Sequence, residues 1–293
     1  MARFFIFESV MEDRKITKID VFFFLDADYV SAFKKLGLNS IDDIFSFTAG
    51  QDLAKKSLAS FRSRIKFQTD SPKKVLFLKR YNRPPVYLQI KNWLAQKNLI
   101  SFGRIDYQTA INLMNLGINT AKVVAFGEQK KFLLEKRSFC ITEQIPNAES
   151  IERRLPDCFN HTNSQNRSMR NKFINELAQS IKTFHNTGFR HMDLYFSHIF
   201  YDDKNSFYLI DLSRVFKPAI MTEYYRVKDI SQLFYSASSK YFSNTDRLRF
   251  YFAYADCDHL SDTDKSFIKK VINKVRRIEH HDKKKQNKAV IRR

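Results

Sequence analysis

The 293-residue chain contains little cysteine and no long apolar stretch. Its three cysteines, Cys140, Cys158 and Cys257, lie far apart and form no CxxC pair, which argues against a disulfide framework and against a zinc module. No run approaches the ~20 apolar residues of a membrane-spanning helix. The N-terminal MARFFIFESV is too short for a secretion signal and lacks its small-residue cleavage site. We therefore expect a cytoplasmic protein.

Acidic residues are also scarce relative to basic ones. The chain has 51 lysine and arginine residues but only 31 aspartate and glutamate residues, which gives a formal net charge of +20. Such a balance usually indicates a polyanionic neighbour, which can be nucleic acid, an anionic membrane surface or a phosphorylated substrate. A compositional bias towards Lys, Asn, Phe and Ile explains much of the charge equally well. The charge alone does not choose a partner.

The order of predicted elements indicates an α+β protein with two lobes. Alternating apolar residues predict strands, and apolar residues at helical spacing predict helices. Before Pro146 the pattern is strand-rich with one helix, and after it the pattern is helix-rich. We predict strands over 21–25, 61–68, 74–81, 122–127, 137–144 and 206–212, and helices over 29–36, 104–116, 168–186, 226–238, 245–255 and 262–277. The expected domains are an unassigned extension (1–44), an N-lobe (45–146), a C-lobe (147–278) and a charged, frayed tail (279–293).

Two aspartates are the best candidates for chemistry. Asp193 lies in a loop directly after a long predicted helix, and Asp211 lies eighteen positions later, at the end of the strand FYLID. A short strand between them brings both carboxylates to the same place. Phosphoryl transfer needs such a pair, because one carboxylate orients the attacking hydroxyl and accepts its proton while the other holds magnesium.

These residues carry a resemblance to kinases. HMDLYFSH (191–198) resembles the kinase catalytic loop, and LIDLS (209–213) stands where the metal-binding Asp-Phe-Gly stands. The closer resemblance is to the lipopolysaccharide core kinases, the WaaP and Kdo kinase family, also called the InaA family. That family has a similar H-x-D-x-x-x-x-H loop and a similar IDL-x-R turn, here ending at Arg214. The resemblance implies a two-lobed, protein-kinase-like fold.

The resemblance also implies which residues bind ATP. Lys79 in VLFLKRY matches the lysine that holds the α- and β-phosphates, and Asp106 matches its acidic partner, which is usually glutamate. Gly50 is all that remains of the glycine-rich phosphate loop, and a plain turn explains it as well. Glu143 to Ile145 would be the hinge that contacts adenine.

The catalytic segment departs from the protein-kinase pattern at two positions. Met192 replaces the arginine that receives an activation-loop phosphate, and His198 replaces the asparagine that holds a second metal. His198 either ligates a metal, bonds a phosphate oxygen when protonated, or only braces the loop. Asp229 matches the buried helix aspartate that braces the catalytic loop. Only eighteen positions separate it from Asp211, which leaves little room for a peptide-binding activation segment and favours a small acceptor.

The resemblance predicts an ATP- and Mg²⁺-dependent kinase that phosphorylates heptose or Kdo in the lipopolysaccharide inner core. Asp193 and His191 would be catalytic residues of the loop, and Asp211 would hold the metal together with His198. The expected partners are an anionic glycolipid and the anionic inner-membrane surface, with the protein peripheral to its cytoplasmic face and nucleic acid disfavoured. The alternatives are an atypical protein kinase, a kinase of another small molecule, and an inactive pseudokinase or basic scaffold.

Two further segments admit two interpretations each. Trp93 and Tyr87, among lysines, are either an interfacial or acceptor-binding surface or a helix packed on the N-lobe. The C-terminal KKVINKVRRIEHHDKKK is either a basic amphipathic helix on anionic lipid or a solvated helix end.

Overall fold

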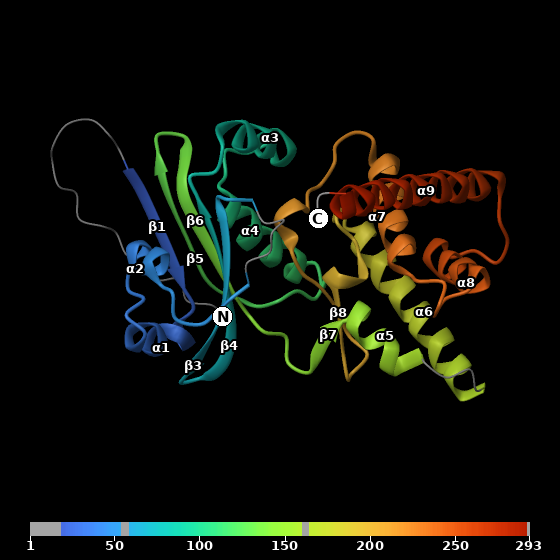
Figure 1. Ribbon diagram of the computed structural model, residues 1–293, viewed down its shortest axis with the longest axis horizontal. Helices are drawn as coiled ribbons and strands as arrows, with labels where there is room; N and C mark the ends of the chain where they lie inside the picture. The colour runs from blue at the N-terminus through green and yellow to red at the C-terminus, as the bar shows by residue number, and fades with distance from the viewer. Residues whose placement is uncertain (1–18, 54–58, 160–163, 292–293) are drawn as a thin grey trace. The chain divides into compact units, whose positions relative to one another are not determined.

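The structure is a computed structural model that describes residues 19–53, 59–159 and 164–291. It divides into two compact units, Met1–Pro146 and Asn147–Arg293 (Figure 1). Within the described ranges, no helix combines the length and the apolar composition needed to cross a bilayer.

Unit 1 is built on a six-stranded antiparallel sheet with the strand order β1-β5-β6-β4-β3-β2. The strands are β1 (Ile19–Leu25), β2 (Gln51–Asp52), β3 (Arg62–Asp70), β4 (Lys73–Asn82), β5 (Val123–Lys131) and β6 (Leu134–Glu143). The helices are η1 (Ala27–Tyr29), α1 (Val30–Lys35), α2 (Ile41–Ser46), α3 (Val86–Gln96) and α4 (Phe102–Asn115).

The two faces of this sheet pack against different helices, because successive side chains of a strand point to opposite faces. On β6, Phe139 and Ile141 belong to a buried cluster that also contains Phe33 of α1 and Ile44 of α2. The opposite face packs on α4. Gly103 of α4 approaches β6 so closely that an added Cβ would lie 2.8 Å from the backbone oxygen of Phe139. The sheet therefore fixes the position of α4.

Unit 1 contains more structure than the sequence predicted. Residues 19–46, unassigned as a domain, supply the edge strand β1, which pairs with β5, and helices α1 and α2, which cover the apolar core. The N-lobe was expected to hold one helix in its sheet, and α4 is that helix. A second helix, α3, precedes it between β4 and β5, at Tyr87 and Trp93, where a helix packed on the N-lobe was one of the two interpretations.

Unit 2 is mainly helical, with a small antiparallel sheet in the order β7-β8-β9. Its strands are β7 (Ala148–Ser150), β8 (Ile199–Asp202) and β9 (Phe207–Leu209). Its helices are α5 (Ile151–Phe159), α6 (Ser164–Asn186), η2 (Phe196–His198), η3 (Leu212–Arg214), α7 (Thr222–Ser236), α8 (Asn244–Ala255) and α9 (Asp262–Ile291).

The frayed tail predicted after residue 278 is helical instead. Helix α9 continues to Ile291, and the sequence from 262 onwards contains neither glycine nor proline to end it. The hydroxyl of Tyr235 in α7 also donates a 2.7 Å hydrogen bond to Asp282, which joins the two helices beyond the predicted helix end.

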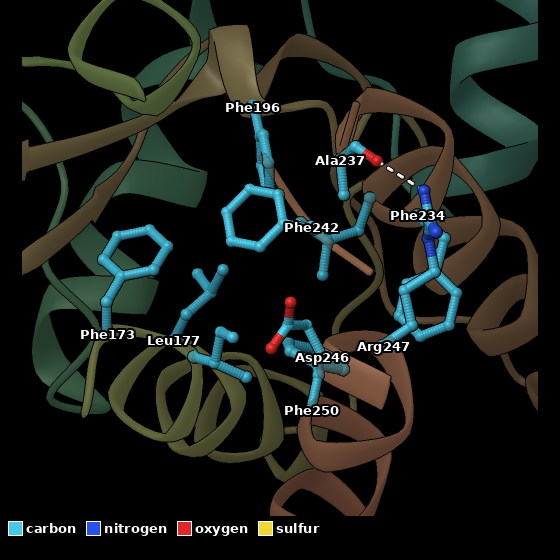
Figure 2. Close-up of a pocket in the computed structure, with 11 residues that line it drawn as sticks. Phe173, Leu177, Phe196, Phe234, Ala237, Phe242, Asp246, Arg247 and Phe250 are labelled. Carbon is cyan, nitrogen blue, oxygen red and sulfur yellow. Dashed lines mark hydrogen bonds between the residues drawn. The ribbon is translucent and has the colours of Figure 1, made fainter. Parts of the chain in front are cut away.

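A small cavity of about 30 Å³ lies in the core of unit 2, among α6, α7 and α8 (Figure 2). Its wall is mostly apolar and includes Phe173, Leu177 and Phe242, and at its edge Arg247 donates a 2.6 Å hydrogen bond to the carbonyl of Ala237. The lining contains none of the predicted site residues. A space of this size holds about one water molecule, so we interpret it as a packing gap.

Candidate active site

The segment that carries Asp193 is held by a buried carboxylate on α7. Asp229 is fully buried and accepts hydrogen bonds from the backbone N–H groups of His191 (2.7 Å) and Met192 (2.8 Å). Burial alone would raise the pKa of Asp229, but hydrogen bonds from His185 and from the His191 backbone lower it below its usual value. Asp229 is therefore a fixed negative charge under the loop.

Two more side chains of α7 continue this support. Gln232 accepts a hydrogen bond from the N–H of Leu194 (3.1 Å) and donates one to the carbonyl of Met192 (2.9 Å). One turn further along α7, Ser236 accepts a 3.1 Å hydrogen bond from the N–H of Phe196. Together with Asp229 these residues lie at i, i+3 and i+7, on one face of the helix. One side of α7 thus holds the backbone on both sides of Asp193.

The residues at both ends of the site have unusual backbone conformations. Met192, before Asp193, has φ 70°, and Asp211 has φ 58°, which are left-handed values that side-chain-bearing residues seldom adopt. Such conformations persist only where the surroundings enforce them, and they cluster at functional sites. A bridge between Arg190 and Phe216, with hydrogen bonds of 2.9 and 3.1 Å, ties the two loops together.

His191 lies behind the loop. Its imidazole is fully buried, and Nε2 donates a 3.0 Å hydrogen bond to the carbonyl of Ile210, the residue before Asp211. Burial lowers the pKa of His191, so the ring is neutral at neutral pH. This geometry gives His191 a positioning role between the two loops.

His198 and Asp211 face each other. Nδ1 of His198 lies 2.8 Å from the carbonyl oxygen of Asp193. A carbonyl only accepts, so the proton of the neutral ring must lie on Nδ1. Nε2 then carries a lone pair, and it lies 4.0 Å from Oδ2 of Asp211.

This pair fits part of a metal site. Mg²⁺ is commonly held by one or two carboxylates together with substrate phosphates and water, which matches the Asp211 carboxylate. An imidazole nitrogen is a donor more typical of transition metals. No group of three or more histidine, cysteine or acidic side chains in the described part of the chain forms a metal cluster.

The Asp193 carboxylate itself is bound by an arginine. Nη1 of Arg214 lies 2.8 and 2.9 Å from the two carboxylate oxygens, and its side chain is 52% exposed. Lys228 of α7 is also near. Burial and the charge of Arg214 lower the pKa of Lys228, while the charge of Asp193 raises it. In the sequence, Arg214 stood out only as the last residue of the IDL-x-R turn. Lys228 was not predicted, because no feature of the sequence marks it.

In unit 1, the structure brings Lys79 and Asp106 together. Nζ of Lys79, on β4, lies 3.8 Å from Oδ2 of Asp106, on α4. The hydroxyl of Tyr81 donates a 2.7 Å hydrogen bond to the same carboxylate oxygen. Oδ1 of Asp106 is buried without a hydrogen-bond partner among the described residues. The shorter aspartate thus reaches the lysine, and a tyrosine from the same strand fixes it.

The other predicted nucleotide contacts are less distinctive. Gly50, with φ 129°, precedes β2, and an added Cβ would lie 2.6 Å from the backbone oxygen of Lys66, so sheet packing alone requires glycine there. The segment 54–58 after β2 lies outside the described residues. Glu143 ends β6 and pairs with Lys74, while Ile145 is buried. The nucleotide roles of Gly50, Glu143 and Ile145 stay predictions.

Comparison with known proteins agrees with this arrangement. Residues 105–254, just over half the chain, match the model of the "Lipopolysaccharide kinase (Kdo/WaaP) family". The lipopolysaccharide core heptose(I) kinase WaaP of Escherichia coli K12 is 25% identical over 196 residues, which cover 64% of this chain and 72% of that protein.

A second heptose(I) kinase and a solved structure are also similar to this chain. The heptose(I) kinase WaaP of Pseudomonas aeruginosa PAO1 is 26% identical over 167 residues, which cover 55% of this chain and 62% of that protein. A solved structure, "WaaP in complex with acyl carrier protein", superposes with a TM-score of 0.64 at 18% identity, covering 87% of this chain and 98% of that one. This likeness confirms the kinase-like fold class.

Proposed function

Because this chain belongs to the lipopolysaccharide kinase (Kdo/WaaP) family and is therefore a kinase, we propose that it transfers the γ-phosphoryl group of ATP to a heptose hydroxyl of the lipopolysaccharide inner core. Heptose is preferred to Kdo because the curated relatives named above are heptose(I) kinases. The observation that supports the proposal is the position of Asp193 and Asp211 on two neighbouring loops. A bridge between Arg190 and Phe216 and the hydrogen bond from His191 to Ile210 connect these loops.

Asp193 would orient the sugar hydroxyl and accept its proton as the oxygen attacks phosphorus. Its carboxylate now bonds to Arg214, so the acceptor must share or displace that contact. An exposed guanidinium suits this exchange, because it can turn to a phosphate oxygen while staying near the carboxylate. Arg214 would then stabilise the charge that develops on the transferred group.

Asp211 and His198 would hold the metal. The chemistry that a metal held there would supply is positive charge that offsets the charge of the nucleotide phosphates. Asp211 offers a carboxylate oxygen, and His198 offers the Nε2 lone pair that its hydrogen bond to the Asp193 carbonyl fixes in place. Lys79, steadied by Asp106, would hold the α- and β-phosphates.

The connection after Asp211 favours a small acceptor over a peptide. Helix α7 begins at Thr222, eleven positions after Asp211, and Arg190 pairs with Phe216 within that interval. Little chain is left to bind an extended peptide. The relative solved in complex with acyl carrier protein also makes acyl carrier protein a candidate partner, which co-purification from cells that express this chain would test.

The first test is phosphate transfer from labelled ATP to purified core oligosaccharide by the Asp193→Asn variant. We expect a loss of roughly a thousandfold in kcat, because general-base catalysis contributes about 10²–10⁴ in rate. Asp203→Asn, at a 65% exposed carboxylate of the β8–β9 turn, is the matched control and should keep full activity. Full activity of Asp193→Asn would reject the assigned base, and label on protein instead of sugar would reject the acceptor.

His198→Ala separates metal binding from loop support, because alanine has no group that can ligate a metal. If Nε2 ligates the metal, the Mg²⁺ concentration for half-maximal activity should rise at least about tenfold, since even the loss of an outer-shell partner of a ligand typically weakens a metal site by 10–100-fold. The melting temperature measures the supporting role in the same sample. A lower melting temperature with an unchanged Mg²⁺ requirement would show that His198 only braces the loop.

A further inference from the structure

Helix α3 of unit 1 exposes a row of apolar residues and buries a glutamine. The usual surface helix buries apolar residues and exposes polar ones. In α3, Gln89 is 3% exposed, whereas Leu94 is 76% and Tyr87 is 70% exposed. Val86 and Ile90 are exposed as well, so the outward residues recur at helical spacing along one side.

This orientation of α3 is built into the fold. Gln89 donates a 2.8 Å hydrogen bond to the carbonyl of Pro84 and accepts a 2.8 Å bond from the N–H of Glu135, on β6. The indole N–H of Trp93 donates a 3.1 Å bond to the carbonyl of Ile100. These bonds fix the rotation of the helix, so its apolar side cannot turn inward.

The tip of the β5–β6 hairpin adds apolar residues at the same end of unit 1 (Figure 1). Lys131 pairs with Leu134, so Phe132 and Leu133 form the turn, and both are 61% exposed. Lys130 near this tip donates a 3.1 Å hydrogen bond to the carbonyl of Leu99, just after α3. The α3–hairpin surface consists of Val86, Tyr87, Ile90, Leu94, Leu99, Phe132, Leu133 and Leu134.

Exposed positive charges accompany this surface. Residues 83–99 include three basic residues, Arg83, Lys91 and Lys97, and no acidic one. The hairpin tip (130–136) adds exposed Lys131 and Lys136, and its acid, Glu135, is 5% exposed. Asp20 of β1 pairs with Lys130 beside the tip, so the excess of positive charge is carried mainly by the side of α3. Exposed apolar and aromatic side chains among lysines are typical of elements that lie in the headgroup region of anionic bilayers.

We propose that the α3–hairpin surface docks unit 1 onto an anionic phospholipid membrane, with Leu94, Phe132 and Leu133 entering the acyl boundary and the lysines contacting headgroups. A second copy of the chain fits less well, because pairing two such surfaces would bring like charges together. This proposal does not depend on which acceptor the kinase uses.

The test is co-sedimentation of the full chain with vesicles of equal parts phosphatidylethanolamine and phosphatidylglycerol, and with phosphatidylcholine vesicles. The wild type should bind the anionic vesicles and bind phosphatidylcholine weakly. Leu94→Glu with Leu133→Glu should lower the partition coefficient by about a hundredfold, since burying one leucine is worth about 1.5–3 kcal/mol. The control is Met114→Glu with Leu116→Glu, at exposed apolar residues at the C-terminal end of α4. It carries the same charge change and should lose much less vesicle binding.

A second pair of variants tests the charges. Lys91→Gln with Lys97→Gln should weaken binding roughly thirtyfold, because each of the two basic residues near an anionic surface contributes about 1 kcal/mol. Lys34→Gln with Lys35→Gln, at exposed lysines of α1, is the matched control. Phosphorylation of soluble core oligosaccharide should be unchanged in all four double variants. If the wild type itself does not phosphorylate the oligosaccharide, the proposed function is rejected, and the membrane proposal still depends only on the vesicle assay.

Three outcomes would overturn the proposal. The first is a wild type that does not bind anionic vesicles, and the second is an equal loss of binding in the surface and control variants. The third is a Leu94→Glu with Leu133→Glu variant that keeps vesicle binding but loses co-purification with an acidic protein, which would assign the surface to a protein partner.

Discussion

Each unit anchors its site residues through one buried carboxyl group, and the pKa values of the two groups are shifted in opposite directions. In unit 2, Asp229 receives two backbone N–H groups and a hydrogen bond from His185, and its pKa is lowered. In unit 1, Glu135 accepts a 2.9 Å hydrogen bond from the N–H of Phe102, where α4 begins, and one from Ser138. Burial raises the pKa of Glu135 to about 7, and the nearby charge of Glu128 adds to this.

The contrast has a simple physical origin. A buried carboxylate stays ionised only when enough donors replace its lost hydration. Asp229 has those donors, so the catalytic segment rests on a charge that persists across the neutral range. Glu135 has fewer, so the start of α4, the helix that carries Asp106, rests on a group that changes charge near neutral pH. We therefore expect unit 1 to be the pH-sensitive half.

The strongest way to break the comparison is Asp229→Asn. The side chain of asparagine has one acceptor oxygen and one NH₂ group. The NH₂ group would face one of the donors that now bond to Asp229, so a buried donor would be left without an acceptor. We expect the free energy of unfolding to fall by about 3 kcal/mol, as for other broken buried charge networks. Denaturant titration measures this, with Asp256→Asn, at a 77% exposed carboxylate, as control.

Activity completes that prediction. In samples that remain folded at low temperature, kcat should fall roughly a hundredfold because the backbone around Asp193 is no longer fixed. Unchanged kcat in a folded sample would mean that the loop keeps its shape without α7.

Lys79→Met addresses the unit 1 site. Loss of the cation should lower kcat/KM for ATP about a hundredfold, because one lysine no longer offsets the phosphate charge. Lys73→Met, at an exposed lysine on the same strand, should have little effect. Equal losses in both variants would indicate a general effect of charge on ATP attraction instead of a specific phosphate contact.

Glu135→Gln sharpens the pH contrast. A carboxyl whose folded pKa is raised from 4.5 to about 7 contributes stability that is fully present below the unfolded value and is lost as pH rises through 7. The wild type should therefore lose about 3 kcal/mol between pH 4.5 and pH 8 that Glu135→Gln retains. Paired denaturation curves across this range measure the difference, with Glu149→Gln, at an exposed glutamate, as control. Parallel curves for wild type and Glu135→Gln would contradict the raised pKa.

The unit 2 site could be predicted from sequence because it is local. Asp193 and Asp211 belong to one short stretch, and Asp229 follows on the next helix. Gln232 and Ser236 were missed, although their spacing of three and seven residues from Asp229 could have suggested them. Lys228 carried no signal, because only the rotation of α7 brings it near Asp193.

Unit 1 was harder to predict because its structure depends on distant partners. The strand over 21–25 was predicted, but its place in the sheet was not, because β1 pairs with β5 about a hundred residues later in the chain. The pairing of Lys79 with Asp106 was inferred from family resemblance, and Tyr81, which fixes Asp106, was not foreseen. The predicted end of α9 was wrong. The charged composition after residue 278 suggested fraying, but that segment contains no residue that breaks a helix.

The row of Asp229, Gln232 and Ser236 on α7 also sets a limit for protein engineering. The catalytic segment takes its shape from a helix that begins more than twenty positions after Asp193, not from its own residues. A graft of residues 191–198 into another scaffold would leave the backbone groups at Met192, Leu194 and Phe196 without partners. The loop can be moved to another protein only together with α7. A chimera that exchanges the loop or α7 alone should lose the hydrogen bonds between them, and with these the backbone conformation of the loop.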